Sequence, residues 1–207
     1  GLLTEYRYNG FGEKISQISP DTGETQYKYN QAGQLTNKVD ARGIETVYRY
    51  DAIGRVVHIH YPAANDDDIH YAYDQVTNGN HAIGRLSTIT DPSGATQYHY
   101  NQNGQISRQD YTIGEANYVI KNHHNAVGEL TGITYPSGRH VAYQHDALGR
   151  IRGVITQSAS AITVDKVVSN IMYQPFGPIA HMDYGNSTQI DIQRDQDYRV
   201  TNILVSD

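Results

Sequence analysis

The stretch "YRYDAIGRV" (residues 48–56) decides the fold, because near copies of it recur along the whole chain. The copies align on the glycine of the pattern Y-x-Y-[DN]-x-x-G. Full copies are "YRYNGFGEK" (6–14), "YKYNQAGQL" (27–35) and "YHYNQNGQI" (98–106), while "YAYD" (71–74) joins "IGRL" (83–86) after an insertion. Weaker copies are "NHHNAVGEL" (122–130), "YQHDALGRI" (143–151), "IMYQPFGPI" (171–179) and "IQRDQDYRV" (192–200). Repetition of this kind is the signature of a repeat architecture.

The spacing of the copies predicts β-hairpins. Five of the eight spacings between anchor positions are 20 or 21 residues, and the other three carry insertions. A second turn signal lies between anchors, as "PDTG" (20–23), "DARG" (40–43), "DPSG" (91–94) and "YPSG" (135–138). This period has room for two strands of ordinary length and two tight turns. The sequence therefore predicts an all-β fold, in which about nine tandem hairpins over residues 1–207 form one long, curved antiparallel sheet.

The anchor glycine predicts a specific loop. Asp or Asn three residues before Gly is typical of a three-residue hairpin loop with a G1 bulge, whose last residue has a positive φ. In the quoted stretch the loop is Ala52 to Gly54, so Asp51 and Arg55 face each other across the hairpin. Copies with Asp have Arg at the second position (51/55, 74/85, 146/150, 195/199), and copies with Asn have Gln or Glu (9/13, 30/34, 101/105, 125/129). This matched substitution predicts that the two side chains are in contact.

Two interpretations of the Asp and Arg pair are open, a catalytic or anion-binding pair and an ion pair beside a turn. A site is normally unique, whereas this pair recurs along the array, so we favour the structural interpretation. We therefore assign no catalytic, cofactor-binding or metal-binding residue and no enzymatic activity. The residues assigned to the structural repeat motif are Tyr6, Tyr8, Gly12, Tyr27, Tyr29, Gly33, Tyr48, Tyr50, Asp51, Gly54, Arg55, Tyr71, Tyr73, Asp74, Gly84, Arg85, Tyr98, Tyr100, Gly104, Asp146, Gly149 and Arg150.

The strand pattern predicts which residues share a face. With regular pairing, Tyr50 lies opposite Val56 and Tyr48 opposite His58. Tyrosines and aliphatic residues then share one face, where the rings either pack between units or stack on sugars. A second set of apolar positions (Ile59, Ile89, Ile133, Val154 and Ile203) has the opposite parity, which places apolar residues on both faces of the sheet.

Composition limits the partners. The net charge of −6 argues against a nucleic acid. The chain has no cysteine, so disulfides and thiolate metal sites are excluded. No apolar run approaches the length needed to insert into a membrane.

Several polar clusters are weaker candidates. The alternating His58 and His60 could share a metal, but no third ligand is evident in the sequence; the pairs His123/His124 and His140/His145 rank lower. "NDDD" (65–68) lacks the carboxylate spacing of a calcium loop and is interpreted as a charged loop tip. "GNST" (185–188) contains a glycosylation sequon at Asn186, which matters only in a eukaryotic secretory pathway. No P-loop, dinucleotide or G-x-S-x-G motif is present.

The pattern Y-x-Y-D-x-x-G-R-L at a period near 21 resembles the YD-repeat family, also called Rhs repeats, and the copies cover nearly the whole chain. The resemblance implies a spiralling β-sheet that builds a hollow shell. In bacterial Rhs and toxin-complex proteins such a shell encloses a C-terminal toxin, and in the animal teneurins it belongs to an adhesion receptor. The self-cleaving aspartyl-protease region of family members that release cargo has no match here.

The resemblance implies a structural shell segment, cut from a longer chain, that encloses or presents a C-terminal toxin or effector domain. The alternative is an extracellular adhesion module that recognises glycans or a surface receptor through exposed tyrosines. The expected location is secreted or at the cell surface, with no cofactor. The expected partners are the rest of the shell and its enclosed domain. We also expect edge-to-edge self-association through the terminal strands near Tyr6–Tyr8 and Ile203–Val205.

Overall fold

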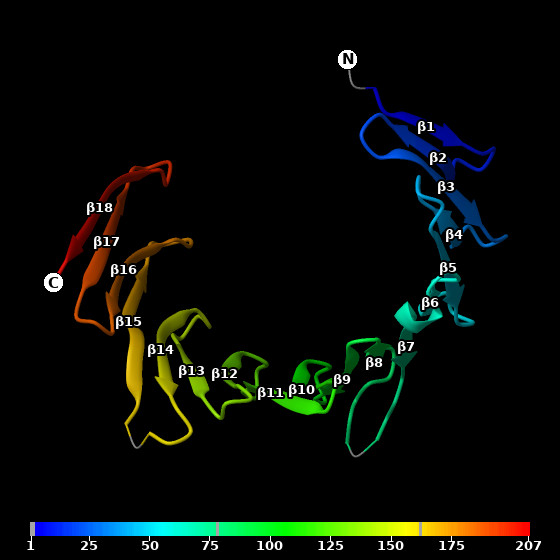
Figure 1. Ribbon diagram of the computed structural model, residues 1–207. Coiled ribbons are helices and arrows are strands. Elements are labelled where there is room, and N and C mark those ends of the chain that lie inside the picture. Colours follow the sequence, from blue (N-terminus) through cyan, green and yellow to red (C-terminus); the bar gives the residue numbers. More distant parts are fainter. Residues whose placement is uncertain (1–2, 78, 162) are drawn as a thin grey trace. The chain divides into compact units, whose positions relative to one another are not determined.

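The computed structural model describes residues 3–77, 79–161 and 163–207. Its elements are strands, apart from one short 3-10 helix, η1 (Asn65–Asp67), and the described residues contain no helix that is long and apolar enough to cross a membrane. In chain order (Figure 1) the strands are β1 (Glu5–Tyr8), β2 (Lys14–Ser19), β3 (Gly23–Tyr29), β4 (Leu35–Val39), β5 (Glu45–Tyr50), β6 (Val56–His60), β7 (Ile69–Tyr73), β8 (Leu86–Asp91), β9 (Gly94–Tyr100), β10 (Ile106–Ile113), β11 (Ala116–His124), β12 (Leu130–Thr134), β13 (His140–His145), β14 (Ile151–Gln157), β15 (Asp165–Tyr173), β16 (Ile179–Tyr184), β17 (Gln189–Arg194) and β18 (Val200–Ser206).

Consecutive strands pair antiparallel, from β1 with β2 up to β8 with β9, and from β11 with β12 up to β17 with β18. The chain divides into two compact units, Gly1–His99 with Asp110–Asn117 and Tyr100–Gln109 with Tyr118–Asp207. Each unit by itself is a single layer of antiparallel strands (Figure 1). The predicted fold class, tandem β-hairpins in an antiparallel sheet, is confirmed.

The anchor loops have the predicted three-residue form. The N–H of Gly54 donates to the carbonyl of Asp51 at 3.1 Å, and the N–H of Asp51 donates to the carbonyl of Arg55 at 2.9 Å. Gly54 has a φ of +87°, a conformation that glycine adopts without steric cost. In the last copy Tyr198 occupies the position of the glycine and adopts a φ of +62°. This copy therefore forms the same loop, although its sequence lacks the glycine.

A β-bulge follows each of these loops and corrects the predicted register. Tyr50 pairs with Val56 as predicted, but Tyr48 pairs with Ile59. The prediction that Tyr48 lies opposite His58 is therefore wrong. The returning strand carries one more residue than its partner at this point, as a β-bulge requires.

The bulge also corrects the predicted faces. Because paired residues share a face and the extra residue reverses the alternation, Val56 and Ile59 lie on the same face as Tyr48 and Tyr50. Equivalent register shifts occur in seven further hairpins among the described strand pairs. The inference that the second set of apolar positions lies on the opposite face is therefore wrong. In the β5–β6 and β7–β8 hairpins, one face therefore collects both repeat tyrosines and both aliphatic positions.

The described chain has almost no buried core. Among the described residues, Ala82 is the one buried hydrophobic residue, and it lies in the β7–β8 connection, where Ser87 and Asn80 are buried beside it. Most strand residues are only half-buried. At the loop tips the side chains of Phe11, Leu148 and Phe176 are 93%, 76% and 96% exposed. A single layer of strands has no second layer to cover either face, which explains this exposure.

Candidate functional site

The Asp and Arg of the quoted stretch form one hydrogen-bonded unit. Oδ1 of Asp51 accepts the backbone N–H groups of Ile53 (3.1 Å) and Arg55 (2.9 Å), and Oδ2 accepts Nε of Arg55 at 2.7 Å. The N–H of Arg55, together with its guanidinium, lowers the pKa of the Asp51 carboxyl below its ordinary value. The predicted side-chain contact between Asp51 and Arg55 is confirmed.

The Asp146 loop repeats this arrangement. Oδ1 of Asp146 accepts the N–H groups of Leu148 and Arg150 at 2.9 and 3.0 Å, and Oδ2 accepts Nε of Arg150 at 2.8 Å. The predicted contact between Asp146 and Arg150 is therefore also confirmed. The same constellation thus recurs in two loops of the array.

The copies that carry Asn explain the matched substitution. Oδ1 of Asn30 accepts the N–H groups of Ala32 and Gln34, as the Asp oxygen does, and Nδ2 then donates to Oε1 of Gln34 at 2.7 Å. An amide donor needs an acceptor opposite it, whereas the second carboxylate oxygen of Asp needs a donor. The side-chain bond recurs between Asn9 and Glu13, Asn101 and Gln105, and Asn125 and Glu129.

Two predicted pairs differ from the pattern. The carboxylate of Asp74 bonds with Nη2 of Arg55 in the preceding repeat at 2.6 Å and accepts the N–H of Gly84. Nη1 of Arg85 donates to the carbonyls of His81 and Ile83. The ends of this loop still meet, because the backbone N–H of Asp74 donates to the carbonyl of Arg85 at 3.1 Å. The predicted side-chain contact between Asp74 and Arg85 gives way to a bond between repeats.

The Asp195 loop departs in a different way. Asp195 accepts the N–H of Arg199 at 2.9 Å, but Nη1 of Arg199 lies 3.4 Å from the carboxylate of Asp197. The expected ion pair is thus replaced by one within the loop. Both side chains of the new pair are mostly exposed, and such pairs contribute little to stability.

The second tyrosine of the motif joins each repeat to the one before it. The hydroxyl of Tyr50 donates to the carbonyl of Leu35 at 2.7 Å, and burial raises the pKa of that hydroxyl. Leu35 is the first residue of a bulge, where the regular strand ladder is interrupted. The same bond is made by Tyr29 to Lys14, Tyr73 to Val56 and Tyr173 to Ile151. In two other repeats a different side chain donates to the equivalent carbonyl: Asn122 to that of Ile106, and Arg194 to that of Ile179.

Arginines of the loops contact the same tyrosines. The guanidinium of Arg55 lies 4.2 Å from the ring centre of Tyr73, and that of Arg150 lies 4.5 Å from the ring centre of Tyr173. A cation over an aromatic ring is attracted by its π-face. The Arg of one repeat therefore binds its own loop Asp and also contacts the tyrosine of the next repeat.

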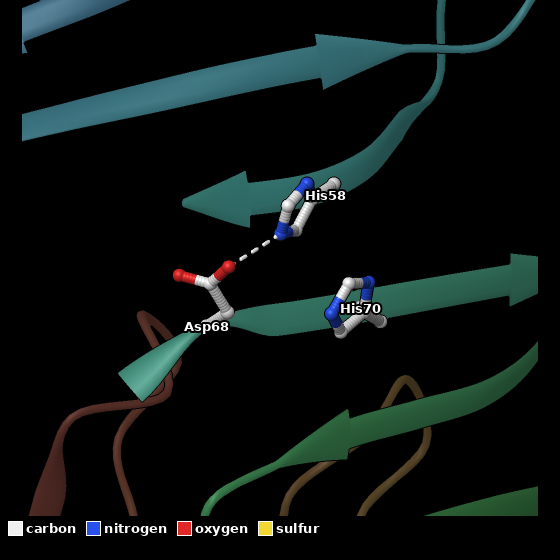
Figure 2. Close-up of side chains that lie close together, drawn as sticks. All are labelled: His58, Asp68 and His70. Carbon is white, nitrogen blue, oxygen red and sulfur yellow. Dashed lines mark hydrogen bonds and ion pairs between the residues drawn. The ribbon is translucent and has the colours of Figure 1, made fainter. Parts of the chain in front are cut away.

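A second constellation, absent from the other hairpins, lies where β6 meets β7. His58 pairs with His70 across the two strands, and their rings stack with centres 4.2 Å apart. Asp68 directly precedes β7 and points toward His58, whose Nε2 is 2.9 Å from Oδ2 (Figure 2). Nδ1 of His60 is 2.9 Å from the same oxygen.

The carboxylate of Asp68 is held by several groups. Its Oδ1 accepts the backbone N–H of Tyr61 at 2.9 Å. That N–H, followed by the rings of His60 and His58, holds the pKa of Asp68 well below its ordinary value. The group of His58, Asp68 and His70 is the one set of three in the described ranges whose carboxylate and imidazole atoms lie close enough to hold a metal ion.

Sequence reasoning found only part of this group. It singled out His58 and His60, but interpreted residues 65–68 as a charged loop tip and did not consider His70. Asp66 and Asp67 do lie in the exposed helix η1, whereas Asp68 is turned toward the histidines. The overlooked signal was D-x-H at 68–70, because alternate residues share one face of a strand.

The other sequence candidates have contacts of their own. His123 and His140 bracket Thr134, whose Oγ1 is 2.9 and 3.1 Å from their ring nitrogens, and burial lowers the pKa of His123. Asn186 lies in the exposed β16–β17 turn, where its Oδ1 accepts from Thr188. A further pair of contacts, unforeseen in the sequence, joins His181 to Asp183 and Asp191, both at 2.9 Å.

Comparisons with known proteins identify the repeat. The model of the family RHS Repeat matches residues 29–66 and 124–161. The comparison with curated proteins found no match. Solved structures with a similar fold include a crystal structure of TcdB2-TccC3, with a TM-score of 0.89 and 15% identity over 99% of this chain and 11% of that chain.

Two further structures have the same fold. A structure of the Photorhabdus luminescens Tc holotoxin pore has a TM-score of 0.86 and 16% identity over 98% of this chain and 11% of that chain. A crystal structure of TcdB2-TccC3 without its hypervariable C-terminal region has a TM-score of 0.79 and 14% identity over 99% of this chain and 12% of that chain. The chain thus spans about a tenth of the length of the structures it matches.

Proposed function

The chain carries RHS repeats, and we propose that it is a structural segment of a protein shell that encloses or presents a C-terminal toxin or effector domain of its parent protein. In this role the chain forms part of the shell wall and catalyses no reaction. Its Asp, Arg and Tyr side chains hold repeats together, and no enzymatic activity is proposed for them.

One observation carries this proposal. The repeats form single-layered sheets whose side chains are mostly half-exposed, with large apolar groups such as Phe11 and Phe176 almost fully exposed at loop tips. Soluble proteins rarely leave extended apolar surface uncovered unless it meets a partner. A wall with contents on one side and further repeats at its edges supplies that cover.

The similar structures support the same function. They belong to toxin complexes, and one was solved without a hypervariable C-terminal region. By analogy, the domain enclosed by the parent of this chain is a variable C-terminal effector. A protein of this type acts outside its producing cell, so we propose that it is secreted or displayed at the cell surface.

The alternative function is adhesion through tyrosines that bind glycans or a receptor. Tyr6 and Tyr8 are about half-exposed and are the rings best placed for it. In contrast, Tyr29, Tyr50 and Tyr73 use their hydroxyls within the array. These internal bonds favour a structural role for most of the ladder.

Limited proteolysis of the full-length parent protein tests the shell function. In the wild type, we expect the C-terminal domain to resist a protease that cleaves the isolated domain. In Gly94→Val a side chain would collide with the carbonyl oxygen of Thr112 and would occupy a φ of +145°, so the wall should open and the domain should be cleaved. Gly10→Val is the matched control, because a side chain there meets open space.

Equal cleavage of the C-terminal domain in the wild-type parent and in isolation would contradict enclosure. Binding of a glycan that protects the exposed tyrosines, in a parent protein with no protected domain, would support the adhesion function instead.

A further inference from the structure

The group at the β6–β7 junction contains the side chains that bind transition metals. His58 comes from β6, Asp68 directly precedes β7 and His70 lies within β7, so the group spans the β6–β7 junction (Figure 2). Two imidazoles and one carboxylate make a common ligand set for zinc, which often leaves a fourth position open to water. Neutral imidazole also binds copper and nickel, so the chemistry points to a divalent ion of this class.

The distances suit such an ion after a small closure. Metal–nitrogen bonds of about 2.0–2.1 Å in a tetrahedral site place neighbouring ligand atoms about 3.3 Å apart. Nε2 of His58 and Oδ2 of Asp68 are 2.9 Å apart, and all three ligand atoms lie within 4.8 Å of one another. His70 is exposed, so rotation of its ring out of the stack with His58 can bring a nitrogen closer.

Further groups orient the carboxylate. The N–H of Tyr61 binds Oδ1 of Asp68, and His60 lies beside both oxygens at 2.9–3.0 Å. Outer partners that fix a ligand in place typically strengthen a metal site by 10- to 100-fold or so. The His181 contacts offer a comparison within the same chain, because they comprise two carboxylates and a single imidazole and lack the second nitrogen ligand.

We propose that His58, Asp68 and His70 bind one divalent transition-metal ion of the zinc class, with His60 and the N–H of Tyr61 positioning the carboxylate. The ion would link β6 to β7, whose pairing consists of His58 with His70 and Ile59 with Ile69. A cross-link at this short pairing would stabilise the junction between two repeats. The site is separate from the repeat motif and does not depend on the shell function.

Isothermal titration calorimetry of the tag-free protein with ZnCl₂ tests the proposal. We expect one ion per chain at pH 7.5. Asp68→Asn retains the acceptor for Tyr61 but loses the charge, and His70→Ala removes an exposed ligand; each should weaken binding by about tenfold or more. The matched controls Asp66→Asn and His81→Ala change exposed residues of the same two kinds and should bind as the wild type does.

Two readouts besides affinity distinguish a built site from adventitious binding. X-ray absorption of the zinc-loaded protein should contain the signature of two imidazole ligands and lose it in His70→Ala. Zinc should raise the thermal midpoint of the wild type by about 2–4 °C and leave both ligand variants unchanged. Binding should weaken between pH 7.5 and 5.5, because protons compete for the imidazoles.

Absence of stoichiometric binding would overturn the proposal, as would equal affinity in the wild type, Asp68→Asn and His70→Ala. Circular dichroism of the variants at low temperature confirms that loss of binding is not loss of fold. A variant that unfolds is replaced by His58→Gln, for which the same loss of affinity is expected.

Discussion

At the scale of single residues, the repeat has two interchangeable chemistries. In both, one side-chain oxygen of Asp or Asn accepts two N–H groups of its loop. The remaining group is an acceptor in Asp51 and a donor in Asn30, so the residue four positions later is Arg in one case and Gln in the other. This contact could be predicted from one sequence because loop chemistry is local and because the several copies of the loop show the matched substitution.

The residues of the β6–β7 group could be predicted only in part for the opposite reason. His58 and Asp68 are ten positions apart, and their contact depends on how η1 and its flanking turns fold back. No repeated copy of that loop exists in the sequence to reveal the pairing.

A double-mutant cycle at Asp146 and Arg150 tests the pairing rule. Asp146→Asn should lower the thermal midpoint by about 1–2 °C, because it places an amide donor against the guanidinium. Adding Arg150→Gln should recover most of the loss, since the pair then matches Asn30 and Gln34. Differential scanning calorimetry measures the thermal midpoints. A double variant whose midpoint falls by the sum of the two single losses would contradict the rule.

Removal of one hydroxyl tests the bond between repeats. Tyr50→Phe should cost about 0.5–1.5 kcal/mol in the free energy of unfolding, since the carbonyl of Leu35 loses its donor. Tyr48→Phe is the control from the same strand, because no hydroxyl bond from Tyr48 is found among the described contacts. Chemical denaturation that gives equal losses for both variants would argue against a role for the hydroxyl.

At the scale of elements, the three-residue loops with their G1 bulge were predictable, and the second bulge at Val56 and Val57 was not. The glycine with positive φ at position 54 is dictated by turn chemistry. The extra residue after it depends on the hydrogen bonds of the partner strand and of the next repeat, including the Tyr73 hydroxyl that donates to the carbonyl of Val56. Because one extra residue reverses the alternation of side chains, this one feature changed the predicted face of Ile59.

The pairing of β16 with β17 should be sensitive to pH. Asp191, and then Asp183, raises the pKa of His181 above its ordinary value of 6.5. A raised pKa in the folded state means that these contacts stabilise fully below about pH 6.5 and lose their contribution as pH rises through the folded value. His181→Gln should therefore be more destabilising at pH 5.5 than at pH 8.5, as measured by thermal unfolding.

The control for this prediction is His81→Gln, which changes an exposed histidine of the other unit and should show no such dependence. A loss for His181→Gln that is equal at both pH values would show that the contacts are those of a neutral imidazole.

At the scale of the whole molecule, the strand edges govern behaviour in solution. β18 pairs with β17 and is exposed along its entire length. An exposed strand offers backbone N–H and C=O groups to another chain. We expect self-association that depends on concentration, and we expect Leu204→Lys to reduce it. Light scattering coupled to size exclusion measures this, with Val127→Lys at a loop tip as the control for added charge. A strict monomer across a wide concentration range would contradict the expectation.

The period of the repeats could be read from the sequence, and so could the hairpin array that follows from it. The contents of the proposed shell could not be predicted, because no pattern in these residues is specific to an enclosed domain. The exposure of Phe11 and Phe176 at the loop tips could not be predicted either, because it depends on the sheets having a single layer.

A cryo-EM structure of the full-length parent protein tests the shell function most directly. We expect β1 and β18 each to pair with a strand of an adjoining repeat, and the wall to surround density for a C-terminal domain. An array whose two terminal strands are unpaired, standing outside any enclosed volume, would contradict it.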